Sequence, residues 1–415
     1  MELNTFDFHP KVAAGVAAAN YTTPTPIQAQ AIPLVMQGHD IVGLAHTGTG
    51  KTAAFVLPIL HRLMRGGRKR VRALVIAPTR ELAEQIHEEI GRLGRRTGLK
   101  SVTVYGGVGF NPQVDRLKRG AEIVVACPGR LLDHIRQGTI DLTSLEVLVL
   151  DESDRMFDMG FLPDIRRIIR HVPAQRQTLL FSATMPDDIL RLTHEVLQAP
   201  IKVQVNTTGP ASTVSHLLYP VDQHLKTPLL LELLRHTDTA SVLIFTRTKL
   251  RAKRLGEQLE KAGYRAASLQ GNLSQARRQA VMNGFRKGTF QILVATDVAA
   301  RGIDVTQISH VINYDMPDTA DAYTHRIGRT GRNDKTGDAF TFITSEDEAM
   351  VRSIERLLHA RIKRCTLSGF DYKKAASSRP AEFTRPARKP QRRRTQKKTA
   401  PFKAYSEGPQ VVGQR

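Results

Sequence analysis

Residues 45–52, with the sequence Ala-His-Thr-Gly-Thr-Gly-Lys-Thr, constrain the fold of this chain more than any other segment. They follow a short apolar run at 41–44 and precede a stretch of helical periodicity at 52–64. A strand, a glycine-rich turn and a helix in that order form the context that a phosphate-binding loop requires. Glycines allow backbone N–H groups to converge on one anion at the positive end of the helix dipole. The segment predicts an α/β fold with a phosphate site.

The side chains of this segment suit a nucleotide with its metal. Lys51 places a charge near the β- and γ-phosphates, and Thr52 offers a hydroxyl to Mg²⁺. The residues expected to surround the phosphates are Thr47, Gly48, Thr49 and Gly50. The strict motif begins with glycine, whereas this chain has Ala45. The alternative is a glycine-rich turn with an incidental Gly-Lys-Thr, but the flanking strand and helix favour the phosphate loop.

Length, charge and cysteine content limit the class of protein to which this chain can belong. A chain of 415 residues is too long for one core, so two domains are expected. The net charge of +22 indicates a polyanionic partner, either nucleic acid or anionic lipid. Two cysteines, Cys127 and Cys365, make neither a disulfide framework nor a zinc site. Residues 1–7 lack the regions of a signal peptide, and no run approaches about 18 consecutive apolar residues. We therefore expect a soluble, cytoplasmic protein without a membrane segment.

Short β-branched runs alternate with helical patterns along most of the chain. In the first half the expected strands lie at 73–77, 101–105, 122–126, 147–150 and 177–181. The alternation restarts with runs at 241–245, 265–269, 291–295, 310–313 and 339–343. Strands separated by helices predict parallel sheets buried on both faces, with ligands at the carboxyl ends of the strands. The fold class is therefore α/β, with two parallel-sheet domains in tandem.

Composition also suggests where the domains end. The stretch 200–213 contains Gly-Pro and few large apolar side chains, so it reads as a linker region. We expect a first domain over 1–206, a linker over 207–213, a second domain over 214–365 and a basic tail over 366–415. Residues 371–415 hold 13 Lys and Arg, 3 Asp and Glu, and five prolines. Such a segment buries too little to fold, which predicts disorder.

The N-terminal region contributes one candidate nucleotide contact. Residues 10–19 predict a helix, and Asn20 suits the left-handed position at its end. Two prolines then hold an extended turn over 21–28. Gln28 could present its amide to an adenine edge. The alternative is an ordinary loop before a helix that starts near Ile27.

Polar or glycine-rich motifs follow the strands of the first half, at 78–82, 106–107, 127–130, 151–154 and 182–184. The strand 147–150 ends in Asp151 and Glu152. Asp151 would hold Mg²⁺ and Glu152 would polarise the attacking water. An acidic helix start is the structural alternative. All these motifs are expected at one edge of the sheet, together with the phosphate loop.

Two motifs in the second half suit the same chemistry. Residues 323–332 carry three arginines between glycines, and Arg329 and Arg332 could act as arginine fingers on a γ-phosphate. Read alone, this run could equally be a solvated basic loop. In 295–304, Thr296 could meet a nucleic-acid phosphate and Asp304 a ribose hydroxyl, or the segment is simply a capped turn.

Taken together, these motifs resemble the DEAD-box RNA helicases, superfamily 2 proteins with two RecA-like domains. The resemblance covers about residues 6–365, with every family motif in order. The run at 154–161, Asp-Arg-Met-Phe-Asp-Met-Gly-Phe, is most similar to the bacterial RhlE-type branch. The resemblance implies ATP and Mg²⁺ as ligands and RNA, as single strands and short duplexes, as a largely sequence-independent partner.

The resemblance also implies roles for individual residues. Those recognising adenine are Phe6, by stacking, and Gln28. Those binding phosphate, metal or water are Lys51, Thr52, Asp151 and Glu152. Those lining the RNA backbone in the first domain are Arg80, Gly107, Gly129 and Arg130. Those doing so in the second domain are Thr246, Gln275, Arg278 and Thr296, although Gln275 and Arg278 could instead bridge the domains. Those coupling nucleotide state to strand separation are Ser182 and Thr184, and those completing the nucleotide site or its coupling to RNA are Asp304, His325, Arg329 and Arg332.

The chain departs from the family pattern at a few positions. Ser153 replaces the usual Ala between the carboxylates, a small change with which we expect activity to survive. Cys127 replaces a Thr, which removes a hydroxyl from one RNA contact. His46 replaces Gln, and Gln270 and Asn272 replace His and Asp. Phe6 lies closer to Gln28 than is usual.

The expected function is an ATPase that separates short RNA duplexes or remodels ribonucleoproteins, with ribosomal or mRNA-decay complexes as candidate partners. One alternative is an ATP-gated RNA clamp or chaperone with little turnover, against which the intact Lys51, Glu152 and Arg329 argue. Another is a DNA-directed motor of the same superfamily, against which the Gln28 segment and the short core argue.

Overall fold

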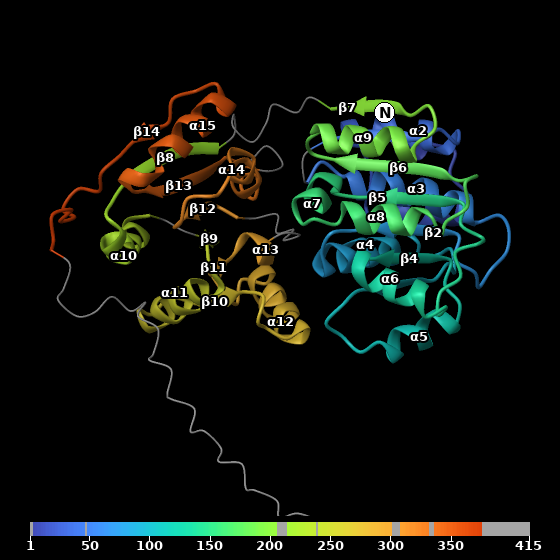
Figure 1. Ribbon diagram of the computed structural model, residues 1–415, viewed down its shortest axis with the longest axis horizontal. Coiled ribbons are helices and arrows are strands. Elements are labelled where there is room, and N and C mark those ends of the chain that lie inside the picture. Colours follow the sequence, from blue (N-terminus) through green and yellow to red (C-terminus); the bar gives the residue numbers. More distant parts are fainter. Residues whose placement is uncertain are drawn as a thin grey trace, which may run out of the picture. The chain divides into compact units, whose positions relative to one another are not determined.

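The computed structural model describes residues 3–45, 48–205, 214–237, 240–300, 308–331 and 336–375. Within these residues the chain forms two parallel sheets of seven strands each, in tandem (Figure 1). The predicted α/β class with two parallel-sheet domains is confirmed. We call residues 3–205 the first lobe and residues 214–372 the second lobe.

The first sheet has the strand order β3-β4-β2-β5-β6-β1-β7, and every pairing is parallel. Its strands are β1 Ile41–Leu44, β2 Ala73–Ile76, β3 Ser101–Val104, β4 Ile123–Ala126, β5 Val147–Leu150, β6 Gln177–Ser182 and β7 Ile201–Gln204. The four central strands β4, β2, β5 and β6 are buried at every residue, as is β1. Burial on both faces explains why these strands read as continuous apolar runs.

Helices cover both faces of the first sheet (Figure 1). One face packs against α1 Pro10–Ala18, α2 Pro26–Met36, α3 Lys51–Leu63 and α4 Arg80–Leu93. The other packs against α6 Pro128–Arg136, α7 Ser153–Asp158, α8 Leu162–Ile169 and α9 Asp187–Val196. The short 3₁₀ helix Leu3–Thr5 precedes α1, and α5 Asn111–Lys118 follows β3. As predicted, Asn20 follows α1 in a left-handed conformation, at φ 55°.

The second sheet repeats this arrangement with the order β10-β11-β9-β12-β13-β8-β14. Its strands are β8 Val214–Pro220, β9 Val242–Phe245, β10 Ala266–Leu269, β11 Ile292–Ala295, β12 His310–Asn313, β13 Gly337–Ile343 and β14 Lys363–Arg364. Its helices are α10 Lys226–His236, α11 Lys249–Lys261, α12 Gln275–Arg286, α13 Asp297–Ala300, α14 Ala320–Ile327 and α15 Glu348–Leu358, with 3₁₀ turns at Gln223–Leu225 and Ser345–Asp347.

The ends of the two lobes show features that composition did not predict. Ile201–Gln204 lies within the first domain expected over 1–206, although its surrounding stretch 200–213 has the composition of a linker, and it forms β7 and pairs with β1. It is an edge strand in which only Val203 is fully buried, so its sequence lacks a core pattern. The tail begins later than 366, because Leu367, Phe370 and Tyr372 pack against the second lobe. The linker 207–213 and residues 376–415 lie outside the described residues.

Across the six described ranges, no helix is both long enough and apolar enough to span a membrane.

Candidate functional site

The carboxyl ends of the first sheet bring the predicted motifs together. Parallel register pairs Ile76 with Leu150, and Leu150 with Leu180. The residues that follow these strands therefore emerge side by side at one edge of the sheet. The segments that begin at Ala45, Pro78 and Asp151 all belong to this edge, as the sequence predicted.

Two glycines in a left-handed backbone conformation and one buried lysine stabilise the phosphate loop. Gly48 and Gly50 both have φ 89°, a conformation that side chains other than glycine rarely adopt. Lys51 is the first residue of α3 and is buried, and its Nζ donates to the Ala45 carbonyl oxygen at 2.6 Å. Thr52 is half-buried in the first turn of α3. His46 and Thr47 lie outside the described residues.

Gln28 fixes the loop from the side of α2. Its Nε2 donates to the Gly50 carbonyl at 3.0 Å, and its Oε1 accepts the Thr25 N–H at 3.0 Å. A Cβ on Gly50 would lie 2.4 Å from Gln28 Nε2, so this contact requires glycine. Phe6 is 6% exposed and packs on Phe8. The adenine roles of Gln28 and Phe6 remain predictions.

A buried acidic cluster follows β5. Asp151 is 2% exposed, and burial raises its pKa to about 7 although Lys51 lowers it. Glu152 has a left-handed backbone at φ 51°, and its Oε2 accepts Arg155 Nη1 at 2.8 Å. Burial raises the pKa of Glu152, but Arg155, Lys51 and Arg329 outweigh it, so the pKa lies below the ordinary value. The Glu152 carboxylate is therefore ionised at neutral pH.

Asp154 joins this cluster to the segment after β6. Its backbone N–H donates to Ser182 Oγ at 3.2 Å, and its Oδ2 accepts the N–H groups of Ala183 and Thr184 at 3.1 and 3.0 Å. The Thr184 hydroxyl donates to the same oxygen at 3.2 Å. Ser182 and Thr184 were predicted as coupling residues, whereas Asp154 and Arg155 were not assigned roles. The sequence feature that could have identified Asp154 and Arg155 is their position directly after Asp151 and Glu152.

The two substituted motif positions have local explanations. Ser153 is fully buried, and its hydroxyl donates to the Leu150 carbonyl at 3.3 Å. The extra hydroxyl is therefore satisfied within its own turn. Cys127 precedes α6, and burial raises the pKa of its thiol to about 12. It lies there as a neutral thiol.

Three of the four predicted RNA contacts of the first lobe, Arg80, Gly129 and Arg130, line a cavity of about 350 Å³. Gly107 has φ 78°, and a Cβ there would lie 2.2 Å from Arg80 Nη1. A Cβ on Gly129 would meet no atom within 4 Å. Arg130 Nη1 donates to the Val108 carbonyl at 3.1 Å. The glycines leave the backbone accessible beside two arginines.

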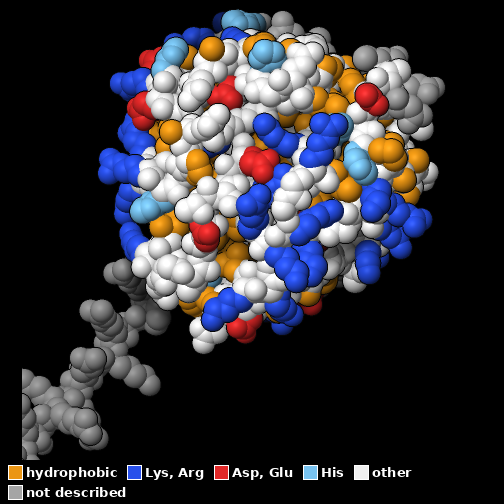
Figure 2. All heavy atoms as spheres, turned by 90° about the vertical axis from the view of Figure 1, so that its right-hand side faces the viewer, with side chains coloured by type: hydrophobic (Ala, Val, Ile, Leu, Met, Phe, Trp, Pro, Cys, Tyr) orange, Lys and Arg blue, Asp and Glu red, His pale blue; other side chains and the backbone are white. Residues whose placement is uncertain are grey.

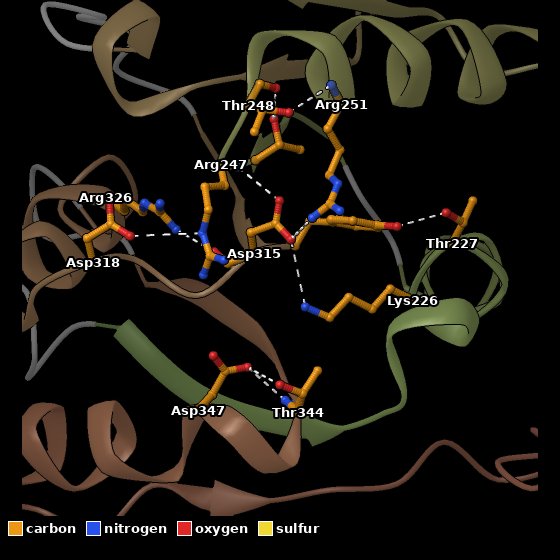
Figure 3. Close-up of polar contacts among 12 residues, drawn as sticks. Lys226, Thr227, Arg247, Thr248, Arg251, Asp315, Asp318, Arg326, Thr344 and Asp347 are labelled. Atoms are coloured by element: carbon orange, nitrogen blue, oxygen red, sulfur yellow. Dashed lines mark hydrogen bonds and ion pairs between the residues drawn. The ribbon is translucent and has the colours of Figure 1, made fainter. Parts of the chain in front are cut away.

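In the second lobe, Asp315 organises the turn after β9 (Figure 3). Its Oδ2 accepts the Arg247 N–H at 2.9 Å, and its Oδ1 accepts the Arg251 guanidinium and lies 3.8 Å from Lys226 Nζ. Thr246 begins this turn and is fully buried, with its hydroxyl 3.4 Å from the Thr248 carbonyl. Asp315 has no recognisable motif in the sequence, because its partners come from distant segments.

Arg326 ties the segment after β11 to α14. Its guanidinium donates to both oxygens of Asp297 at 2.6 Å, to Asn313 Oδ1 at 3.1 Å and to the Asp315 carbonyl at 2.7 Å. A cavity of about 360 Å³ beside it is lined by residues that include Thr296, His325 and Arg329. Burial, with Arg155, lowers the pKa of His325 to about 4, so its imidazole is neutral at neutral pH.

Of the remaining predicted residues, Arg278 and Gln275 are described by the structure, whereas Asp304 and Arg332 are not. Arg278 is buried and donates to Glu81 at 2.7 Å, a contact of the kind that the bridging alternative requires. Within the described ranges, the buried Gln275 Oε1 has no hydrogen-bond partner. Asp304 and Arg332 lie outside the described residues. No cluster of three metal-binding side chains occurs in the described part of the chain.

Comparison with protein families gives two matches. Residues 25–192 match the DEAD/DEAH box helicase model, and residues 225–334 match the helicase conserved C-terminal domain model. The chain is 42% identical over 372 residues to the ATP-dependent RNA helicase RhlB of Xanthomonas campestris pv. campestris, covering 87% of this chain and 65% of that protein. It is 42% identical to the DEAD-box ATP-dependent RNA helicase CshA of Geobacillus kaustophilus, covering 85% and 76%. The chain thus spans about two thirds of the length of its RhlB relatives.

Among solved structures, Saccharomyces cerevisiae Dbp5 bound to RNA and ADP BeF3 is similar with a TM-score of 0.78 and 29% identity, covering 87% of this chain and 95% of that chain. A DEAD box protein from Methanococcus jannaschii is similar with a TM-score of 0.52 and 36% identity, covering 88% of this chain and 99% of that chain.

Proposed function

Because the chain belongs to the DEAD-box helicase family, we propose that it is an ATP-dependent RNA helicase. It couples RNA-stimulated ATP hydrolysis to local separation of short RNA duplexes or to remodelling of ribonucleoproteins. One observation carries this proposal: the ionised Glu152 and buried Asp151 stand at the edge that holds the phosphate loop, and Asp154 joins them to Ser182 and Thr184.

The nucleotide site has the groups that ATP and its metal require. Lys51 and the N–H groups at the start of α3 would hold the phosphates. The oxygen donors fit Mg²⁺, which prefers one or two carboxylates together with phosphate oxygens and water. We assign Asp151 and Thr52 to hold it, and a divalent cation there would offset the burial of the Asp151 carboxylate. Bound Mg²⁺ would neutralise charge on the transferring phosphoryl group.

Hydrolysis requires an oriented water molecule and stabilisation of the negative charge on the transferring γ-phosphate. We assign the first task to the Glu152 carboxylate, which accepts a proton from the attacking water. We assign the second to Arg329 and Arg332 as arginine fingers. The neutral imidazole of His325 would donate one hydrogen bond and accept one at this site without adding charge.

RNA would lie on the predicted contacts of both lobes, through its sugar–phosphate backbone. Arg80 and Arg130 supply charge next to open glycine backbone at Gly129 in the first lobe. Backbone contacts do not read sequence, and 2′-hydroxyls favour RNA over DNA. The complex of Dbp5 with RNA supports RNA as partner. A cytoplasmic location, ribosomal or mRNA-decay complexes and an RhlE-type branch remain predictions.

The decisive experiment measures steady-state ATP hydrolysis by the full chain with and without single-stranded RNA. We expect strong stimulation by RNA, weak stimulation by DNA of the same sequence, and a loss of at least about a hundredfold in Glu152→Gln, because that variant lacks the carboxylate that orients water. A flat response to RNA despite tight binding of ATP and RNA would instead identify an ATP-gated clamp. Stimulation by DNA equal to that by RNA would identify a DNA-directed motor.

A further inference from the structure

The amino edge of the first sheet carries a cluster of exposed basic side chains. The loop before β2 contributes Arg68, Lys69 and Arg70, and the loop before β3 contributes Arg95, Arg96 and Lys100. Together we call these six residues the amino-edge surface. Lys118 and Arg119, just before β4, are also exposed. Since the sheet order is β3-β4-β2, these three loops are neighbours. Figure 2 faces this side of the first lobe and shows Lys and Arg gathered over it.

Buried groups hold the loops in place and leave the basic side chains outside. Arg72 is 3% exposed, and its guanidinium donates to Glu146 and to the carbonyls of Leu63, Arg65 and Gly67. The loop before β2 is therefore folded around this one inward arginine. Arg68, Lys69 and Arg70 of the same loop are exposed.

A buried glutamate joins the loops to one another. Glu122, just before β4, accepts the Lys69 N–H with Oε1 and the Lys100 N–H with Oε2, both at 2.8 Å. Arg68 reaches the Thr97 carbonyl at 3.3 Å. Lys69 has φ 60°, and a Cβ on Gly120 would lie 2.7 Å from Lys69 Cβ. The backbone of this surface is thus tightly packed, so little ordering is required when a ligand binds.

Positive charge exceeds negative charge on this surface. The Glu122 carboxylate accepts two backbone N–H groups and offsets one positive charge, while Glu146 is paired with Arg72. For the described residues, none of the six basic side chains forms an ion pair with a carboxylate. The exposed large hydrophobic residues of the described chain are Leu190, Leu250 and Leu357, and none lies in these loops. Protein interfaces need apolar or aromatic anchors, whereas a phosphate backbone needs charge alone.

We propose that the amino-edge surface is a second RNA-binding site, which takes the phosphate backbone of an RNA that extends beyond the helicase site. This inference rests on the proposed function. The surface lies on the opposite edge of the sheet from the phosphate loop, separated by a four-residue strand of about 13 Å and its loops. A short strand bound at the carboxyl edge cannot reach it, but a longer or structured RNA can. The site tethers that RNA without reading its sequence.

The test compares two RNAs, a hairpin with a single-stranded extension and a short single strand, by fluorescence anisotropy over a series of salt concentrations. Two variants of the full chain each remove three charges: Arg68→Gln/Lys69→Gln/Arg70→Gln and Arg95→Gln/Arg96→Gln/Lys100→Gln. A matched control removes three exposed charges of the second lobe, Arg352→Gln/Arg356→Gln/Arg361→Gln. A charge-conserving control is Arg68→Lys/Arg70→Lys.

We expect each amino-edge variant to weaken hairpin binding about tenfold at moderate salt and to lower the slope of log affinity against log salt by about two. Binding of the short strand and the ATPase rate at saturating RNA stay unchanged, and Arg68→Lys/Arg70→Lys binds as wild type. Equal weakening in the second-lobe control, equal weakening for both RNAs, or unchanged hairpin binding would overturn the proposal.

Polyglutamate is titrated in the same assay as an acidic polypeptide. If the amino-edge variants lose polyglutamate binding but bind the hairpin as wild type does, the surface serves an acidic polypeptide and the proposal is overturned. A separate measurement tests the proposed function itself: if RNA does not stimulate ATP hydrolysis by the wild-type chain, the proposed function is wrong. The variants leave Arg72, Glu122 and Gly120 intact, and an unchanged thermal midpoint shows that the loops still fold.

Discussion

At the residue scale, the substituted motif positions depend on local partners. Ser153 fits because its hydroxyl donates to the Leu150 carbonyl one turn back, so no buried polar atom is left unpaired. Cys127 is different: the residue is only partly buried, but desolvation of its thiol, with the Glu81 carboxylate nearby, disfavours the ionised form.

Because its thiol is desolvated, Cys127 is expected to react slowly with alkylating reagents. With a pKa of about 12, Cys127 exists as thiolate in only about one molecule in ten thousand at pH 8, against a substantial fraction for a free cysteine. Native protein treated with iodoacetamide at pH 8 should modify Cys127 at least about a hundredfold more slowly than free cysteine, as followed by peptide mass spectrometry. The same peptide in urea should react at the ordinary rate. Equal native and free rates would show that the thiol is not shielded.

At the scale of the element, close contacts between neighbouring strands decide which residues the first core tolerates. Gly43 lies in β1 beside β6, and a Cβ on it would lie 2.5 Å from the Phe181 ring. Phe181 is fully buried and packs on Phe55 with ring centroids 5.4 Å apart. The aromatic side chain thus occupies the space above the glycine, and β1 carries the phosphate loop at its end.

We expect Gly43→Ala to lower the free energy of unfolding by about 1–3 kcal/mol through overpacking. Combined with Phe181→Leu, the loss should be smaller than the sum of the two single losses, because the smaller side chain makes room for the methyl group. Urea unfolding measures all three variants. Gly91→Ala is the matched control: its Cβ meets no atom within 4 Å inside α4, so it should stabilise the fold by up to about 1 kcal/mol. Additive losses would contradict the steric account.

At the scale of the whole molecule, the compact unit that contains both sheets ends at Tyr372. Tyr372 stacks edge-on against Phe370 at 4.9 Å, and its hydroxyl accepts the Leu367 N–H at 2.8 Å. Residues 376–415 contain 11 Lys and Arg against 2 Asp and Glu. Their expected role is sequence-independent attraction of structured RNA.

Two truncations separate these contributions. Deleting 376–415 should raise the RNA concentration for half-maximal ATPase, with a difference that disappears at high salt, and should spare the rate at saturation. Deleting 371–415 should have the same effect on RNA and should also lower the free energy of unfolding by about 1 kcal/mol, because Tyr372 is lost. Kinetics with a structured RNA and urea unfolding measure the two effects. An unchanged RNA requirement at moderate salt would rule out the tether.

The sequence by itself determined the α/β class, the two sheets and the segments that meet at the carboxyl edge. Those features follow from local rules: apolar runs make buried strands, glycines make the phosphate loop, and parallel strands end on one edge. Only the tertiary structure decided the contacts of Asp154, Asp315 and Glu122, because each carboxylate binds backbone N–H groups of loops that are distant in sequence. Edge strand β7 was likewise invisible, since it buries one side chain and is defined by its hydrogen bonds to β1.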